Sequence, residues 1–350
     1  MNIYDKKHKS NMRKYVAKTE AAYIEFAKKV IAIANDPLAK NQKSFKYSNR
    51  LKIQKKVDKL TGEFNAELLE LMSKSIAAEW ALSNTKNDAL ISATIKAGKK
   101  VGIDRGLNDR NIKALQSFIS RKVNGMNLSD RVWNLTQAYK DELEMHLQLG
   151  IMNGDSAAII ARRTKQYLNE PDKLFRRVRD ASGKLVLSKP AKAYNPGRGV
   201  CRSSFKNARR LAATETNMAY RRADYERWNG DPAVVGFEVM LSVSHPVRDI
   251  CDELKGKYPK NFIFTGWHPN CFCYAVPVLL NDKEFDKYTD SILEGKDFDS
   301  TQSKNYVDNV PKGFDDWVKT NQERIEKMKG KGTLPYFITD NFKGGNIPSK

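Results

Sequence analysis

Metal-ligating residue types are concentrated in one stretch of this chain, residues 244–274, and this concentration is the strongest constraint on its fold. The stretch holds three of the four cysteines and two of the four histidines: Cys251, Cys271, Cys273, His245 and His268. The remaining cysteine and histidines are scattered singly along the sequence. One ion bound by these side chains would draw distant parts of the stretch together, because its ligands must converge on one point.

The spacing within the stretch allows several of these side chains to reach one ion. Cys271 and Cys273 are two residues apart, so in an extended segment both sulfurs leave the same side of the backbone. His268 lies three residues before Cys271, and the intervening Pro269 and Asn270 are a turn-forming pair that folds the chain back. We therefore expect one histidine and two cysteines to converge.

Further upstream, Cys251 and His245 are available to complete a tetrahedral set of nitrogen and sulfur ligands, which zinc favours. Five candidates compete for four positions, so one of them is spare: His245, Cys251, His268, Cys271 or Cys273. A closed site with four protein ligands is structural, because no position is left for water or substrate. The alternatives are buried apolar cysteines beside turn histidines, or a disulfide, which the lack of an N-terminal signal peptide disfavours. We predict a structural zinc clip.

The charge balance points to a polyanionic partner. The chain has 62 basic and 41 acidic residues, a net charge of +21, and nucleic acid is the commonest partner for such a protein. Solubility, or docking onto an acidic protein surface, explains the same charge, and no DNA- or RNA-reading motif decides between them. No apolar run approaches the roughly 20 residues that span a bilayer, so we expect a soluble protein made in the cytoplasm without a membrane span.

The pattern of apolar residues predicts a mainly α N-terminal helical body, followed by a small α+β module with a metal-clipped β-hairpin. Helices are predicted at about 10–35, 63–83, 86–100, 109–124, 129–150, 155–170 and 205–228. The predicted domains are a basic helical region at 1–125, a helical body at 126–230, a Cys/His β module at 231–282, and a C-terminal helix with a flexible tail at 283–350. A projecting hairpin and loop at 171–203, turning at Ala181-Ser182-Gly183, interrupts the helical body.

The Cys/His module is predicted to be a two-stranded hairpin. Alternating residues after Pro232 predict one strand, the run at 272–280 predicts its partner, and 251–267 forms the long connection between them. Residues 283–312 are polar and predicted to be loop. A final helix around 314–325 is expected, and the run 334–338 can pack as a clasp.

Residues 40–59 form a markedly basic segment in which Phe45, Tyr47, Leu51 and Ile53 interrupt the lysines and arginine. Basic residues interleaved with aromatics can grip phosphates and stack bases. A solvated helix face explains the same pattern, and the sequence leaves both interpretations open.

Four segments taken in order give the chain a family resemblance: RLAATETNMAYRRADYERW, VGFEVMLSVSHPVRDICD, WHPNCFCYAVPVLL and FDDWVKTNQERIEKMKGKGTLPYFITDN. The chain resembles the tailed-phage minor head proteins, the head-morphogenesis family of the Mu F-like group, over roughly residues 130–340. The positions that carry the resemblance are Arg210, Ala213, Thr214, Glu215 and Thr216, then Cys251, then His268, Pro269, Cys271 and Cys273.

The resemblance implies a structural minor capsid protein, associated with the portal vertex and with head assembly or DNA packaging and delivery. Its implied partners are the portal protein, the major capsid protein and packaged double-stranded DNA, with multiple copies in the virion. The implied location is the phage head, after assembly in the host cytoplasm.

Two other functions remain as alternatives. A metal-dependent nuclease would use the residue types that hold a divalent ion and activate water, here His245, Asp249, His268 and Asn270. Thiolates crowd the same place, however, and a three-thiolate site is typically closed, so we expect no enzymatic activity. A general DNA-binding protein outside any virion is the other alternative.

Overall fold

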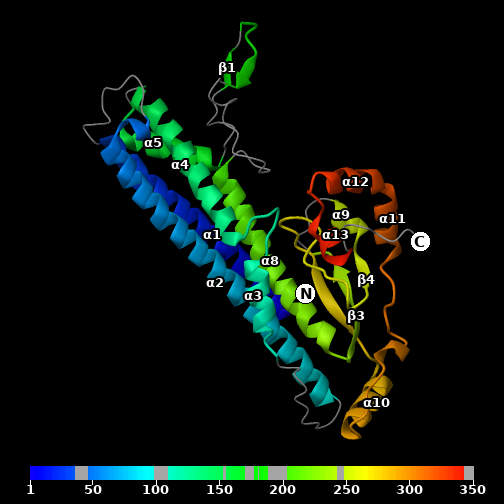
Figure 1. The fold of residues 1–350 in the computed structure, drawn as a ribbon. Helices are drawn as coiled ribbons and strands as arrows, with labels where there is room; N and C mark the ends of the chain where they lie inside the picture. The colour runs from blue at the N-terminus through cyan, green and yellow to red at the C-terminus, as the bar shows by residue number, and fades with distance from the viewer. Residues whose placement is uncertain are drawn as a thin grey trace. The chain divides into compact units, whose positions relative to one another are not determined.

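The computed structural model describes residues 1–35, 46–97, 109–152, 155–169, 177–179, 181–187, 203–242 and 248–342. The chain divides into two compact units, each assembled from separated stretches of sequence. Unit 1 consists of Met1–Arg13, Lys74–Gly125 and Ala213–Lys350, and unit 2 consists of Lys14–Ser73 and Met126–Ala212. Three long helices supply residues to both units: α1 (Ile3–Ile31), α2 (Leu51–Ala97) and α8 (Ser204–Gly230) (Figure 1). No helix among the described residues is long and apolar enough to span a membrane.

Unit 2 is a helical bundle built around aromatic side chains. Its parts of α1, α2 and α8 pack with α4 (Leu128–Met152), and α5 (Ala157–Asn169) packs on α4. Each of the four packed helices contributes a fully buried ring: Tyr23, Phe64, Tyr139 and Phe205. The Tyr23 ring lies 4.5 Å from Tyr139 and 4.9 Å from Phe64. Aromatic pairs contribute roughly 0.5–1.5 kcal/mol each beyond the area that they bury, so this cluster holds the helices side by side.

The predicted helices at 63–83 and 86–100 are one continuous helix, because α2 runs without interruption from Leu51 to Ala97. The polar residues around Ser83 suggest a helix break in the sequence. In the structure, the side chain of Asn84 donates to the carbonyl oxygen of Trp80 and that of Asn87 donates to that of Ser83. These bonds satisfy the buried side-chain amides of Asn84 and Asn87 on the helix itself, so the polar residues do not interrupt it.

The predicted hairpin is confirmed in its described part. Strand β1 (Arg177–Arg179) pairs antiparallel with β2 (Leu185–Leu187), and the turn between them includes Gly183 at φ 79°. A left-handed backbone at this position favours glycine, which has no Cβ to clash. The rest of the predicted insertion at 171–203 lies outside the described residues, except for residues 181–184 and 203.

Unit 1 contains a three-stranded antiparallel sheet in the order β4-β3-β5. The pairing of β3 (Val234–Met240) with β5 (Tyr274–Leu279) confirms the predicted hairpin. The predicted connection at 251–267 is more than a loop, because it contains the short helix α9 (Ile250–Glu253) and the third strand, β4 (Gly256–Tyr258). Two strands alone are marginally stable in water, so this third strand makes the sheet self-supporting.

One face of the sheet packs against the C-terminal helices of unit 1 (Figure 1). Their core is mainly aromatic: Trp228, Phe237, Tyr258, Phe262, Phe264, Trp267, Phe314 and Phe337. The predicted final helix is two helices, α11 (Lys312–Thr320) and α12 (Gln322–Gly330). The predicted clasp is confirmed, since Phe337 and Ile338 are fully buried at the start of α13 (Tyr336–Asn341).

The prediction that residues 283–312 form a loop is wrong for the first part of that segment. Helix α10 (Asp282–Leu293) begins there with a capping box, in which Asn281 and Glu284 satisfy each other's backbone N–H groups. The Asn-x-x-Glu spacing is the sequence signal for this start. Tyr288 on α10 is buried with Val235 and Leu280, so a second small core lies along β3.

A buried histidine in unit 2 makes its stability depend on pH. His146 on α4 contacts the hydroxyl of Thr164, and burial lowers the pKa of His146 to about 3. The unfolded chain binds a proton below the ordinary pKa of about 6.5, whereas the folded chain excludes it. The stability that this residue contributes is therefore present above pH 6.5 and falls as the pH is lowered, by about 2 kcal/mol between pH 7 and pH 5.

Urea unfolding of the wild type at both pH values should show that loss of stability, and the loss should be absent in His146→Gln. An equal pH dependence in both proteins would contradict this assignment.

Candidate metal centre

The cysteines of the site are brought together by α9 and by the loop that leads into β5. Cys251 is the second residue of α9, whose start is fixed by a capping box between Asp249 and Asp252. The Asp249 carboxylate accepts a hydrogen bond of 2.7 Å from the backbone N–H of Cys251. Cys271 and Cys273 come just before β5, at the end of the loop that begins after β4. The capping box therefore sets the position of the first thiol.

The three thiols form a compact, buried cluster. Their sulfur atoms all lie within 4.8 Å of one another, and the Sγ atoms of Cys251 and Cys271 are 3.7 Å apart. All three are free cysteines with at most 2 % of their surface exposed. Sulfurs bound to one tetrahedral zinc ion at about 2.3 Å would be about 3.8 Å apart. The cluster is compatible with a metal site, as the sequence predicted.

His268 presents a ring nitrogen to this cluster. Its Nε2 lies 3.1 Å from the Cys251 sulfur, and its Nδ1 lies 2.8 Å from the carbonyl oxygen of Pro269. Because a carbonyl only accepts hydrogen bonds, Nδ1 carries the proton, and the lone pair of Nε2 faces the thiols. This is the second hydrogen bond that metal-binding histidines usually make. The predicted turn is present, with Asn270 at φ 62° and the Cys271 N–H bonded to the His268 carbonyl.

Asp249 is a further candidate ligand, which the sequence singled out only for the nuclease alternative. Its Oδ2 lies 3.2 Å from Nε2 of His268, and both side chains are partly exposed. With Nδ1 protonated, the Nε2 lone pair faces a carboxylate oxygen and a sulfur, three atoms that all attract positive charge. A cation between these atoms would be attracted by all three, and without one the thiol hydrogen of Cys251 can be donated to the Nε2 lone pair. The cluster is therefore buried at its thiols and open to solvent at His268 and Asp249.

The protonation of the thiols reflects their mutual contact. Hydrogen bonds from Cys251 and Cys273 lower the pKa of Cys271, and the guanidinium of Arg221 lowers it further, although burial opposes both. The same hydrogen bonds raise the pKa of Cys251. Without a cation, the three thiols thus share their protons, because they cannot all ionise next to one another. A metal ion bound to the three thiolates would take the place of those protons and release them to solvent.

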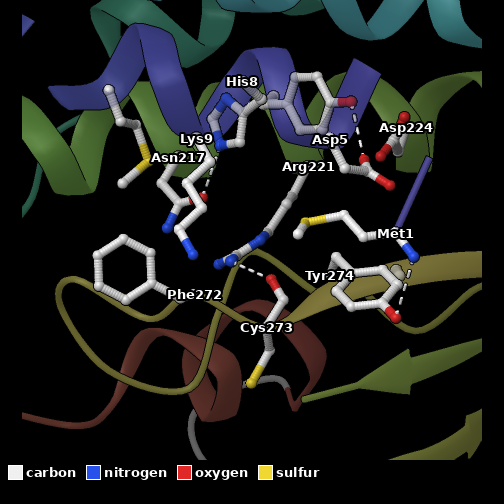
Figure 2. A pocket seen from close by; sticks show the side chains of 13 residues that line it. Met1, Asp5, His8, Lys9, Asn217, Arg221, Asp224, Phe272, Cys273 and Tyr274 are labelled. Atoms are coloured by element: carbon white, nitrogen blue, oxygen red, sulfur yellow. Dashed lines mark hydrogen bonds between the residues drawn. The ribbon is translucent and has the colours of Figure 1, made fainter. Parts of the chain in front are cut away.

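Two side chains of α8 bind the loop 259–273, which carries Cys271 and Cys273 and is called the ligand loop below. Neither side chain was predicted from the sequence. Asn217 donates a hydrogen bond to the carbonyl oxygen of Cys271. Arg221, one turn later, donates to the carbonyl oxygens of Thr265, Cys271 and Cys273. Figure 2 shows the guanidinium of Arg221 reaching the Cys273 carbonyl. The only sequence signal for this pair is their spacing of four, which places them on one face of a helix.

Asn217 also connects the site to a buried histidine. The Nε2 of His8 lies 2.9 Å from the amide oxygen of Asn217 (Figure 2). The Nδ1 of His8 lies 2.5 Å from the Glu79 carboxylate, and the His8 ring stacks on Tyr220 at a centroid distance of 4.1 Å. His8, Asn217 and Tyr220 line a small cavity of ≈ 30 Å³, which Cys273 also borders. Glu215, on the same helix as Asn217, forms an ion pair with Arg121, at 2.7 Å.

Three of the five predicted ligands form one cluster, Cys251, Cys271 and Cys273, and a fourth, His268, contacts this cluster through Cys251. The fifth, His245, lies outside the described residues. Comparisons with protein-family models, with curated proteins and with solved structures found no match to this chain. What the site can do is therefore read from its own residues and geometry.

Proposed function

We propose that this chain is a structural minor head protein of a tailed phage, in which Cys251, Cys271, Cys273 and His268 hold a structural zinc ion. The observation that carries the proposal is the contact between the two motifs of the family resemblance. Asn217 and Arg221 lie on α8 one and five residues after the Arg210–Thr216 motif, and both bond to the loop that carries the Cys-x-Cys motif. Two motifs that serve one site are better evidence for a family relationship than two isolated patterns.

Zinc is the metal that suits the donor set best. Three thiolates and one imidazole are soft and borderline ligands, which favour zinc over magnesium or calcium. Four protein ligands close the coordination shell, so the ion would join α9, the ligand loop and the start of β5 without catalysing a reaction. The core around Phe237, Tyr258 and Trp267 adjoins the cysteines, so the ion would stabilise unit 1 as a whole.

The metal is tested by mass spectrometry of the protein purified without chelators. We expect about one zinc per chain, and an intense thiolate-to-metal absorption band after replacement by cobalt. A chain that contains no zinc, and that binds neither zinc nor cobalt after reduction of its thiols, would contradict the proposed site.

The role in the phage head is tested on particles rather than on the isolated chain. Heads purified from the phage that encodes this protein should contain its peptides, in a constant ratio to the portal protein. Disruption of its gene should give particles that do not infect the host. If peptides of this chain were absent from purified heads that contain portal and major capsid proteins, the structural role would be wrong.

A contact with packaged DNA is the second part of the proposal. Four lysines in the first turns of α2 are exposed to solvent: Lys52, Lys55, Lys56 and Lys59. Tyr47 and Ile53 are buried and cannot stack on bases, whereas Phe45 lies outside the described residues. The segment thus offers charge for phosphates, without the aromatic platform that the sequence suggested for Tyr47.

We therefore expect DNA binding that depends strongly on salt and not on sequence. Each phosphate contact contributes about −0.9 to the slope of log affinity against log salt. Replacing the four α2 lysines by glutamine should reduce the magnitude of that slope by up to about 4, measured by fluorescence anisotropy. Replacing two exposed lysines of unit 1, Lys319 and Lys327, is the control. An unchanged slope would contradict DNA contact at α2, and plasmid cleavage with magnesium that is lost in His268→Ala would favour the nuclease.

A further inference from the structure

Arg221 is a buried cation whose charge has no carboxylate partner among the described residues. Only 5 % of its surface is exposed, and its hydrogen bonds go to three backbone carbonyl oxygens. The guanidinium also lies 5.1 Å from the centre of the Phe264 ring. A buried charge is strongly destabilising unless an opposite charge or a full set of hydrogen bonds compensates it. Carbonyl dipoles satisfy the donors of Arg221 but leave its net charge uncompensated.

The metal-ligand cluster carries the opposite charge. Three thiolates and a neutral imidazole around a divalent ion have a net charge of −1. Arg221 lies against this cluster, since it bonds to the carbonyl oxygens of two of the three cysteines. Groups that support metal ligands in this way usually fix ligand geometry and tune metal affinity.

The backbone of the ligand loop is shaped to admit the guanidinium. Gly266 has φ 124°, a conformation that side chains of L-residues rarely adopt. A Cβ atom at Gly266 would lie 2.5 Å from a terminal nitrogen of Arg221 and 3.3 Å from the Cβ of Cys271. Glycine at this position therefore leaves space for Arg221 between α8 and the ligand loop.

We propose that Arg221 is the positioning and charge-compensating residue of the metal centre, so that it sets metal affinity without binding the ion. The inference rests on the proposed zinc site. The guanidinium of Arg221 holds the carbonyl groups of Cys271 and Cys273 in place through its forked N–H groups, and its positive charge offsets the negative charge of the thiolates. Asn217 is the neutral member of the same clamp and joins the Cys271 carbonyl to His8 and Glu79.

The test is a chelator-competition measurement of zinc affinity on the full chain. Arg221→Gln removes the charge, and we expect it to weaken affinity about 10- to 100-fold, the usual effect of losing a supporting group. Arg221→Lys keeps the charge but loses the fork, so it should retain more of the affinity. Arg222→Gln is the matched control, because Arg222 is the next residue and pairs with Glu226 on the helix surface. The cobalt spectrum should change in the Arg221 variants and not in the control.

A second variant addresses the case in which Arg221→Gln does not fold. Gly266→Ala displaces the guanidinium while leaving its charge in the chain, and it should shift the cobalt spectrum. Gly295→Ala is its control, because Gly295 also has a positive φ, of 69°, but nothing lies near its Cβ position. Wild-type affinity in both Arg221→Gln and Gly266→Ala would overturn the inference. Failure of the wild-type chain to bind zinc or cobalt would instead overturn the proposed zinc site.

Discussion

Replacing Cys271 by serine is expected to remove the metal ion and to destabilise unit 1 by several kcal/mol, while unit 2 remains folded. Serine is a poor zinc ligand, and the residue replaced is the cysteine whose carbonyl oxygen accepts hydrogen bonds from both Asn217 and Arg221. A ligand present at 1,000 times its dissociation constant stabilises the folded state by about 4.1 kcal/mol, which the variant would lose. The loss falls on unit 1 because the site and its aromatic core belong to that unit.

Unit 2 should tolerate the change because it has its own core. Its aromatic cluster, centred on Tyr23, Phe64 and Tyr139, is formed within unit 2 alone. Limited proteolysis should therefore cut the region 248–342 of the variant much faster than that of the wild type, and leave α4 protected. The control is Cys201→Ser, which removes the cysteine outside the stretch 244–274. Unchanged melting, proteolysis and metal content in Cys271→Ser would contradict the metal clip.

Replacing Asp224 by alanine is expected to destabilise unit 1 by about 3–5 kcal/mol, the usual effect of removing one partner of a buried ion pair. Asp224 on α8 is 3 % exposed and pairs with Lys86 on α2. It also accepts hydrogen bonds from the hydroxyl of Ser83, at 2.7 Å, and from the amide of Asn87, at 2.9 Å. Without it, Lys86 remains buried, and Asp5, at 3.6 Å, is the remaining carboxylate that pairs with it among the described residues.

The measurement is the change in unfolding free energy, followed by hydrogen exchange of α8 so that unit 1 is observed separately. Asp316→Ala is the control, because Asp316 pairs with Lys312 at the surface, where water screens the ion pair and its loss should change stability little. A loss below about 1 kcal/mol in Asp224→Ala would show that Lys86 finds other compensation.

Much of the local structure was predictable because short-range patterns encode it. The alternation around Phe237 predicted β3, the turn before Gly183 predicted the hairpin, and Phe337 and Ile338 predicted the clasp. The candidate metal ligands were also predictable, because the two-residue spacing of Cys271 and Cys273 and the turn after His268 bring these side chains close together within a few residues. The missed start of α10 was readable as well, from the capping pair Asn281 and Glu284.

The sequence by itself determined most of the long helices, the paired strands β3 and β5, and which residues can bind a metal, because helix and strand periods act over a few residues. Only the tertiary structure decided which side chains support the site. Asn217 and Arg221 precede the cysteines that they hold by about fifty residues, and nothing local links them. The same holds for α2, where Ser83 and Asn87 form a helix rather than a break because Asp224 binds them. Burial makes such long-range partners obligatory, since a polar group removed from water must be satisfied by whichever segment packs against it.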